Sequence, residues 1–206
     1  MIPARIVLAS KSPARRMVLE NAGVVFDWCD AAVDEDILKD EALANQWPTE
    51  KLAAALAKAK AEAAAAVSEN NNAGTGTVYV GCDQLLSLNG VIYDKPGDLA
   101  EAGKHLRALS GRTHQLISAV AVHQPGTPLW SHIETAHMHV RPLGKAFIEE
   151  YLQHHSDGIL SSVGAYRLEG YGAQLFEKID GDYFTVLGLP LLPLLEELRK
   201  RGILAF

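Results

Sequence analysis

The residues best suited to chemistry follow the first apolar segment of the chain directly, in the stretch SKSPARR at positions 10–16. Ser12 suits a helix N-cap and Pro13 the first helical position, so a strand end and a helix start meet here. This junction directs backbone N–H groups and the positive end of a helix dipole at one point, where serine hydroxyls and an arginine would complete an anion site. A capped helix with solvated arginines is the simpler alternative, and both interpretations stay open at this stage.

Two acidic residues are candidates for binding a divalent metal ion. Glu35 lies in the acidic segment VDED, which is typical of a solvated loop but also suits a hard cation that prefers oxygen ligands. Asp83 follows the apolar run VYVGC and precedes a second apolar run, so we expect it inside buried β structure. A buried carboxylate without compensation is costly, so Asp83 needs either a hydrogen-bonding partner or a metal ion.

The other polar candidates have ordinary explanations when each is considered alone. Lys60 lies on an alanine-rich helical segment, where lysines are usually solvated, and Lys95 follows a short strand directly. Glu169 lies in a segment rich in glycine, where most glutamates are solvated. Cys82 is expected to be a small buried apolar residue. The eight histidines form no convincing metal-binding pattern.

The composition restricts the class of protein. The chain has 206 residues, of which 48% are hydrophobic and 21% charged, as in an ordinary soluble globular protein. No apolar stretch is long enough to span a membrane, and the N-terminal segment lacks the pattern of a signal peptide. A net charge of −6 disfavours general nucleic-acid binding, and two cysteines without a disulfide or zinc pattern favour the cytoplasm.

Strands and helices alternate along the chain and would hold these residues in place. We expect strands at residues 5–9, 24–29, 77–88, 91–96, 113–123, 129–140 and 174–179, and helices at 13–22, 50–67, 99–109, 145–153 and 191–201. Asn89-Gly90 is a strong hairpin signal, and Thr49 and Asp98 suit helix N-caps. The pattern predicts an α/β fold on a mixed sheet. The two commonest glycine-rich phosphate-binding sequences, GxxxxGK[ST] and GxGxxG, do not occur.

Considered together, the segments resemble one known family. From about Ile6 to Leu198 the chain is similar to the Maf family of nucleoside triphosphate pyrophosphatases, in the segments LASKSPARR, VDE, LAKAKA, VGCDQ, DKP, LSGRTH, VGAYRLEGYG and GDYFTVLGLP. The resemblance implies a single domain over residues 1–206, with a mixed twisted sheet, flanking helices and two lobes around a central cleft, as in inosine-triphosphatase-like folds. It also implies hydrolysis of a nucleoside triphosphate to the monophosphate and pyrophosphate.

The same resemblance assigns roles to individual residues. It implies a divalent cation, Mg²⁺ or Mn²⁺, bound by Glu35 and Asp83, with Asp83 also acting as the catalytic base. Phosphate contacts are implied for Ser10, Arg15, Lys60 and Lys95. Base choice is associated with Ala14, Gln84 and Glu169. Metal-bound water aimed at the α-phosphorus, with cations on the leaving pyrophosphate, is chemistry suited to this cleavage.

The residues at the base-choice positions favour a modified guanine nucleotide. This chain has Ala14, Gln84 and Glu169 at these positions, where family members that prefer pyrimidines carry arginine, threonine and glutamine, respectively. The branch of the family that acts on 7-methyl-GTP carries glutamine and glutamate at the second and third of these positions, as this chain does. A carboxylate can accept the two adjacent N–H groups of guanine, and N7 methylation adds positive charge that strengthens the pairing. Ala14 departs from an aromatic residue in a related protein and forgoes a stacking contribution of about 1 kcal/mol.

Three alternatives remain open. The chain could be a pyrimidine-directed pyrophosphatase acting on dTTP or UTP, or a broad one. It could also be a nucleotide-binding regulator of septum formation, although such a protein would not need both Glu35 and Asp83. A third reading is an α/β domain whose charged loops are only solvated. The sequence leaves the oligomeric state open, with a homodimer among the expectations, and it predicts no nucleic-acid or membrane partner.

Overall fold

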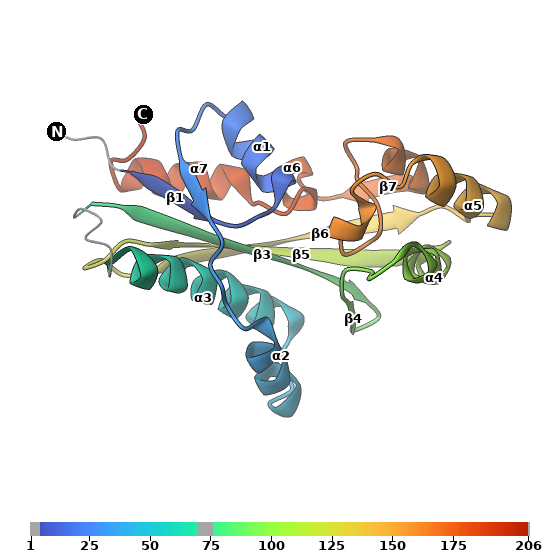
Figure 1. Ribbon diagram of the computed structural model, residues 1–206, viewed down its shortest axis with the longest axis horizontal. Helices are drawn as coiled ribbons and strands as arrows, with labels where there is room; N and C mark the ends of the chain where they lie inside the picture. The colour runs from blue at the N-terminus through green and yellow to red at the C-terminus, as the bar shows by residue number, and fades with distance from the viewer. Residues whose placement is uncertain (1–4, 70–75, 206) are drawn as a thin grey trace. The chain divides into compact units, whose positions relative to one another are not determined.

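The computed structural model describes residues 5–69 and 76–205, and its strands form a seven-stranded sheet (Figure 1). The strand order is β2-β1-β3-β5-β6-β7, and β4 pairs with β3. The strands are β1 Ile6–Ala9, β2 Asp27–Cys29, β3 Val78–Leu88, β4 Val91–Tyr93, β5 Thr113–His123, β6 Trp130–Val140 and β7 Phe176–Asp180. β1 is parallel to β2 and β3, whereas β4 and β7 are antiparallel to their partners. The predicted mixed sheet is therefore confirmed.

The chain divides into two compact units. The first unit comprises Met1–Gln84, Ser118–Glu134 and Leu187–Phe206, and the second comprises Leu85–Ile117 and Thr135–Val186. This division agrees with the expectation of two lobes. The single-domain extent of 1–206 and the central cleft stay predictions.

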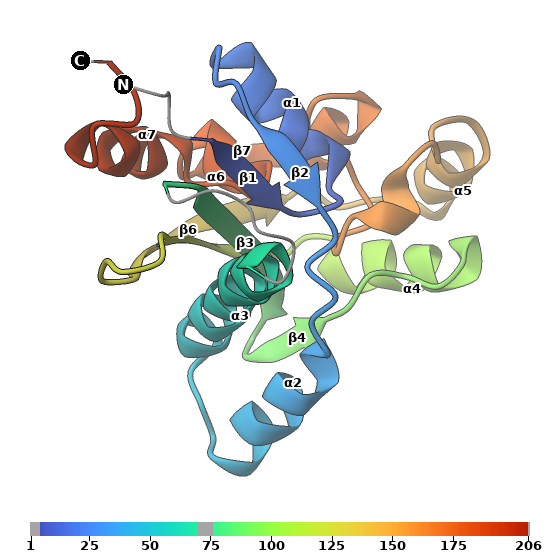
Figure 2. The ribbon, with the colours of Figure 1, turned by 60° about the vertical axis from the view of Figure 1, so that its left-hand side comes forward.

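In the first unit, helices cover both faces of the sheet. Helix α3, Thr49–Glu69, lies on one face, and α1, Pro13–Asn21, lies on the other together with α7, Leu191–Lys200 (Figures 1 and 2). The inward faces follow from the sequence: buried residues recur at helical spacing, in α3 at Ala53, Ala57, Ala61 and Ala64 and in α7 at Leu191, Leu194 and Leu198. Neither α3 nor any other helix in the described part of the chain is long and apolar enough to cross a membrane.

The predicted start of α1 is confirmed. The side chain of Ser12 accepts a hydrogen bond from the backbone N–H of Arg15 at 3.4 Å, and Pro13 is the first helical residue. The helix ends at Asn21, and Gly23 follows with a φ of +71°, a left-handed conformation that glycine adopts without strain. The next strand is shorter than predicted, since β2 covers Asp27–Cys29 only.

The acidic segment after β2 forms a helix that the sequence analysis did not predict. Helix α2 covers Glu35–Ala44, and the side chain of Asp34 caps it by accepting a hydrogen bond from the N–H of Asp36 at 3.2 Å. Acidic side chains in a first turn are stabilised by the positive end of the helix dipole. The loop interpretation was therefore wrong, although Asp34 and Asp36 are exposed to solvent. Glu35 is the first residue of a helix that packs against α3.

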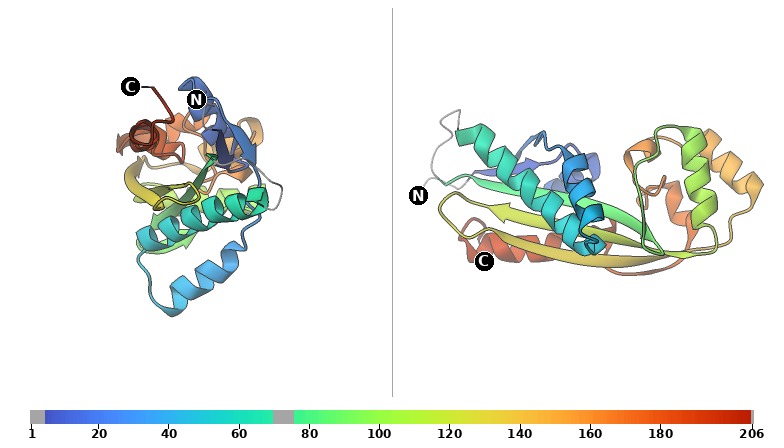
Figure 3. Two further views of the ribbon diagram at one scale, coloured as in Figure 1. Left: turned by 90° about the vertical axis from the view of Figure 1, so that its left-hand side faces the viewer. Right: turned by 90° about the horizontal axis from the view of Figure 1, so that it is seen from below.

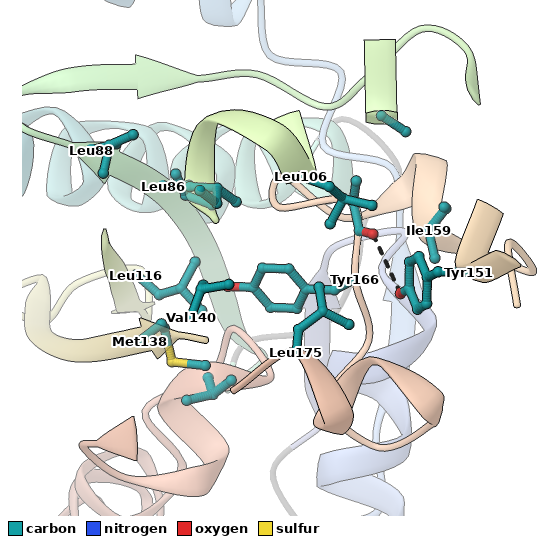
Figure 4. Packing of buried hydrophobic residues seen from close by; sticks show 14 of the residues in the cluster. Leu86, Leu88, Leu106, Leu116, Met138, Val140, Tyr151, Ile159, Tyr166 and Leu175 are labelled. Atoms are coloured by element: carbon teal, nitrogen blue, oxygen red, sulfur yellow. Dashed lines mark hydrogen bonds between the residues drawn. The ribbon is translucent and has the colours of Figure 1, made fainter. Parts of the chain in front are cut away.

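In the second unit, helices α4, Leu99–Leu109, and α5, Lys145–His154, pack side by side (Figure 3). Asp98 caps α4, and Asn89 and Gly90 both have positive φ, as a type I′ hairpin turn requires. The shorter elements are the helix α6 Tyr183–Val186 and the 3₁₀ turns η1 Ile159–Ser161 and η2 Tyr171–Leu175. The core includes Leu86, Leu106, Met138, Tyr151 and Tyr166, with Ile159 and Leu175 (Figure 4). The loop predicted between α3 and β3 lies at residues 70–75, outside the described residues.

Acidification is expected to destabilise the protein through a histidine in this core. His114 is 1% exposed, and its Nε2 lies 2.6 Å from the hydroxyl of Tyr166. Burial lowers the pKa of His114 to about 4, so below pH 6.5 the unfolded chain binds a proton that the folded chain does not. The free energy of unfolding should therefore fall by about 3 kcal/mol between pH 7 and pH 4 on account of this group. Urea unfolding of wild type and His114→Phe should show a weaker pH dependence in the variant, and equal dependence would contradict the assignment.

Candidate active site

The predicted anion site lies just beyond the carboxyl end of β1. Ala9, the last residue of β1, pairs with Gly81 of β3, so Ser10 lies at the level of the β3 residues that follow Gly81. Ser10 is 8% exposed, and its hydroxyl accepts a hydrogen bond from the backbone N–H of Ser12 at 3.3 Å. The start of α1 is thus held against the end of β1, which is the geometry that the sequence pattern predicts for an anion site.

The side chain of Arg15 is fixed by three parts of the chain. Its Nη1 donates to the hydroxyl of Ser10 at 3.3 Å and to the carbonyl of Cys82 at 2.9 Å. Its Nε donates to the carbonyl of Gly188 at 2.8 Å. Because two of the three guanidinium nitrogens are anchored to the protein, the cation is oriented before any ligand arrives, which lowers the entropic cost of binding a phosphate.

The two predicted metal ligands converge on one side chain, that of Lys60. The ammonium Nζ lies 2.5 Å from Oδ1 of Asp83 and 2.7 Å from Oε1 of Glu35. The side chains of Asp83 and Lys60 are 9% and 14% exposed, whereas that of Glu35 is 42% exposed. Asp83 therefore has the compensating partner that its buried position requires, and the two carboxylates share one positive charge.

A close approach of α3 to β3 makes this cluster possible. A Cβ on Gly81 would lie 2.0 Å from the carbonyl oxygen of Ala57 and 2.6 Å from the backbone nitrogen of Ala61, so only glycine fits there. Alternate residues of a strand share a face, so Asp83 points to the same side as Gly81, toward α3. Lys60 lies one residue before Ala61 and reaches Asp83 from the helix.

This cluster fits the predicted divalent cation. Both carboxylates lie within hydrogen-bonding distance of one cationic atom, so their oxygens are placed to share a positive ion. Within residues 5–69 and 76–205, no group of three or more histidine, cysteine, aspartate or glutamate side chains could hold a metal ion. Mg²⁺ is commonly bound by one or two carboxylates with substrate phosphates and water, so two carboxylates are a sufficient protein contribution.

Gln84 lies on the opposite face of β3 from Asp83, as the alternation of a strand requires. Its Nε2 donates to the hydroxyl of Ser118 at 3.0 Å. A Cβ on Gly188, which has a φ of +91°, would lie 3.5 Å from Oε1 of Gln84 and 3.2 Å from Nε of Arg15. Gln84 and Arg15 therefore both lie close to Gly188. Ala14 is half-buried in the first turn of α1.

The remaining cations of the SKSPARR segment do not join this cluster. The guanidinium of Arg16 lies over the ring of Trp28, 4.3 Å from its centroid. The ammonium of Lys11 lies 2.5 Å from Asp30, and this hydrogen bond lowers the pKa of that exposed carboxyl. Arg15 is thus the arginine of this segment that turns into the site. The interpretation of solvated arginines therefore fits Arg16 better than Arg15.

Two predicted site residues belong to the second unit. Lys95 is exposed and is the second residue after β4, separated from it by Asp94. Glu169 lies in the loop before η2, and its Oε1 accepts hydrogen bonds from Arg167. The structure places both side chains in that unit, and their predicted roles toward phosphate and base stay predictions.

Cys82 is fully buried beside this cluster, as expected. Burial raises the pKa of its thiol to about 11, so the group stays protonated at neutral pH. Its backbone carbonyl, rather than its sulfur, contacts the site by accepting a hydrogen bond from Arg15.

Three residues of this arrangement were not found from the sequence, namely Gly81, Ser118 and Gly188. Gly81 and Gly188 allow close approaches of backbone, and Ser118 holds the side chain of Gln84. Gly188 lies 173 positions from its partner Arg15. No local sequence pattern predicts a contact between residues so far apart in the chain. The only local signal is that Gly81 and Gly188 each interrupt an apolar run.

The chain is similar to known proteins over nearly its whole length. A family model described as Maf-like protein matches residues 5–201. A protein of Brucella abortus biovar 1 (strain 9-941) named 7-methyl-GTP pyrophosphatase is 50% identical over 196 residues, covering 95% of this chain and 96% of that one. A protein of Rhizobium meliloti (strain 1021) with the same name is 46% identical, covering 96% of both. One of Hyphomonas neptunium (strain ATCC 15444) named nucleoside triphosphate pyrophosphatase is 44% identical, covering 97% of both.

Proposed function

Because this chain belongs to the family of Maf-like proteins, we propose that it is a nucleoside triphosphate pyrophosphatase. It hydrolyses the anhydride between the α and β phosphates and releases the nucleoside monophosphate and pyrophosphate. The observation that carries this proposal is the convergence of Glu35 and Asp83 on Lys60, beside a guanidinium anchored at the start of α1. Carboxylates and oriented cations at the carboxyl ends of parallel strands suit a polyphosphate substrate.

Glu35 and Asp83 would hold the divalent cation. When bound, Mg²⁺ or Mn²⁺ supplies charge neutralisation on the phosphates and lowers the pKa of a coordinated water. Asp83 is the more buried of the two carboxylates, and a carboxylate at the proposed cation site is suited to accept the proton of the attacking water. Lys60, whose ammonium lies between the two carboxylates here, would pair with a phosphate oxygen in the substrate complex.

Ser10 and Arg15 would bind the phosphate chain. The anchored guanidinium and the N–H groups at the start of α1 are fixed donors, so they stabilise developing negative charge without reorganisation. Lys95 would add a further cation for the leaving pyrophosphate. These local positive charges offset a net charge of −6 where the substrate needs them.

The preferred substrate under this proposal is 7-methyl-GTP. Relatives that are 50% and 46% identical to this chain are named 7-methyl-GTP pyrophosphatase. In this chain, Gln84 and Glu169 stand at two of the base-choice positions. The carboxylate of Glu169 can accept from the adjacent N–H groups of a guanine ring, and the positive charge of the N7-methylated ring strengthens this pairing. Ala14 offers no ring to stack on the base. The homodimer and the cytoplasmic location stay predictions from the sequence.

The test is a kinetic panel of 7-methyl-GTP, GTP, UTP and dTTP with Mg²⁺ or Mn²⁺, with and without a chelator, and with the products identified. The proposal predicts pyrophosphate release, loss of turnover with the chelator, and the highest kcat/KM for 7-methyl-GTP. A higher kcat/KM for UTP or dTTP would favour the pyrimidine-directed alternative. Binding without turnover of any nucleotide would favour the regulator of septum formation.

A further inference from the structure

The second unit contains a pocket whose most polar feature is an ion pair. Its volume is about 270 Å³, near the lower end of the range of about 300–1,000 Å³ typical of small-molecule sites. It lies between the end of α5 and the loop that leads into η2, and its lining includes Tyr151, His155, Ile159, Arg167, Glu169 and Tyr171. Two of these, Tyr151 and Ile159, also belong to the core of the unit (Figure 4).

The ion pair joins Arg167 and Glu169 in an asymmetric way. Both Nε and Nη2 of Arg167 lie 2.9 Å from the same oxygen, Oε1 of Glu169. Both contacts use Oε1, and Glu169 lines the pocket, so Oε2 is the oxygen that we assign to a ligand. The Glu169 side chain is 16% exposed and that of Arg167 is 46% exposed. The exposure of Arg167 limits what this pair contributes to stability, since fully exposed ion pairs contribute only about 0–1 kcal/mol.

The backbone that carries Arg167 is held closely by its surroundings. A Cβ on Gly172 would lie 2.5 Å from the carbonyl oxygen of Arg167, so the chain closes on itself where only glycine fits. That carbonyl also accepts a hydrogen bond from the N–H of Gly170 at 3.3 Å. The hydroxyl of Tyr151 donates to the carbonyl of Ala165 at 3.4 Å, the dashed line of Figure 4. These contacts fix the point from which the guanidinium reaches Glu169.

An aromatic pair lines the same pocket. The rings of His155 and Tyr171 stack with centroids 3.6 Å apart and an angle of 6° between their planes. A flat ring pair beside a carboxylate suits a planar ligand that presents N–H donors at its edge, because the ring surface binds its face and the carboxylate its donors. A purine base with adjacent N–H groups has this chemistry.

We propose that Arg167 is the positioning residue for Glu169 in base recognition: it holds Oε1, so that Oε2 meets the N–H donors of the guanine ring. The proposal rests on the proposed function, which supplies the nucleotide. Without the guanidinium, the Glu169 side chain would rotate freely, and binding of the base would pay the entropy of ordering it. A pyrimidine edge with one donor between two acceptors would gain much less from a fixed carboxylate.

The experiment compares kcat and KM for 7-methyl-GTP and UTP in wild type, Arg167→Met, Arg167→Lys, Glu169→Gln and the double variant Arg167→Met/Glu169→Gln. Lys145→Met is the matched control, since it removes an exposed cation from another glutamate pair of the same unit. Arg167→Met should lower kcat/KM for 7-methyl-GTP about tenfold, mainly through KM, and for UTP less than about twofold. The kcat/KM of Arg167→Lys for 7-methyl-GTP should lie between those of wild type and Arg167→Met. In the Glu169→Gln background, Arg167→Met should cause little further loss of kcat/KM.

Two results would overturn the inference. One is an equal loss of kcat/KM for both nucleotides in Arg167→Met, which a purely structural role would give. The other is an undiminished effect of Arg167→Met in the Glu169→Gln background, because the arginine would then act independently of the carboxylate. Failure of the proposed function is a separate outcome, in which the wild-type protein releases no pyrophosphate from any nucleotide. Thermal unfolding of each variant identifies any that is misfolded, and Arg167→Lys keeps the test available in that case.

Discussion

Replacing Asp83 with asparagine is expected to lower kcat about 1,000-fold, within the range of about 10²–10⁴ that loss of a general base produces. The change would remove the charge proposed to bind the cation and the group proposed to accept the proton, while it keeps the volume of a side chain that is 9% exposed. Nucleotide binding should be largely retained, because the contacts of Ser10 and Arg15 are untouched. Steady-state kinetics with 7-methyl-GTP and calorimetric binding of the same nucleotide measure the two quantities.

The matched control for this change is Asp36→Asn. Asp36 lies next to Glu35 in the first turn of α2, but its side chain is 88% exposed and pairs with Lys39 at 3.8 Å. Its replacement should leave kcat within about twofold of wild type, since changes at exposed positions away from a site are usually small. Full activity of Asp83→Asn would remove Asp83 from the mechanism. Equal losses in both variants would point to a general electrostatic effect instead.

Replacing Gly81 with alanine is expected to have the largest effect on stability. The added methyl group would lie 2.0 Å from the carbonyl oxygen of Ala57 and 2.6 Å from the nitrogen of Ala61, and neither backbone atom can move aside without shifting α3. We expect the free energy of unfolding to fall by about 3 kcal/mol or more. Because a displaced α3 carries Lys60 away from Asp83, kcat should fall as well.

Gly144→Ala is the control for this second prediction. A Cβ at Gly144 would meet nothing within 4 Å, and its φ of −72° is accessible to any residue. Urea unfolding should therefore show a change within about 1 kcal/mol for Gly144→Ala, the cost of a less favourable N-cap. A fall of that size or less for Gly81→Ala would contradict the close approach of α3 to β3.

Elements with a strong local signal were predictable from the sequence. The cap and proline at Ser12 and Pro13 fixed the start of α1, and Asn89-Gly90 gave the hairpin, because these residues favour one backbone conformation on their own. The buried position of Asp83 was also predictable, since an acid between two apolar runs has few other locations.

Other features depend on contacts that no local pattern contains. Helix α2 was missed because three successive acids resemble a solvated loop, and a capping Asp34 together with packing on α3 overrides that preference. Arg15 and Arg16 are neighbours of the same type, yet one binds the carbonyl of Gly188 and the other stacks on Trp28. Which arginine faces the site depends on the distant segments that surround α1, and the sequence pattern does not order those segments in space.

The most direct measurement of the central claim is hydrolysis of 7-methyl-GTP in oxygen-18-labelled water, followed by mass spectrometry of both products. If the cluster of Glu35, Lys60 and Asp83 directs water at the α-phosphorus, the label appears in 7-methyl-GMP and the pyrophosphate is unlabelled. Label in pyrophosphate would mean attack at the β-phosphorus, and label in orthophosphate would mean attack at the γ-phosphorus. Either result would contradict the account.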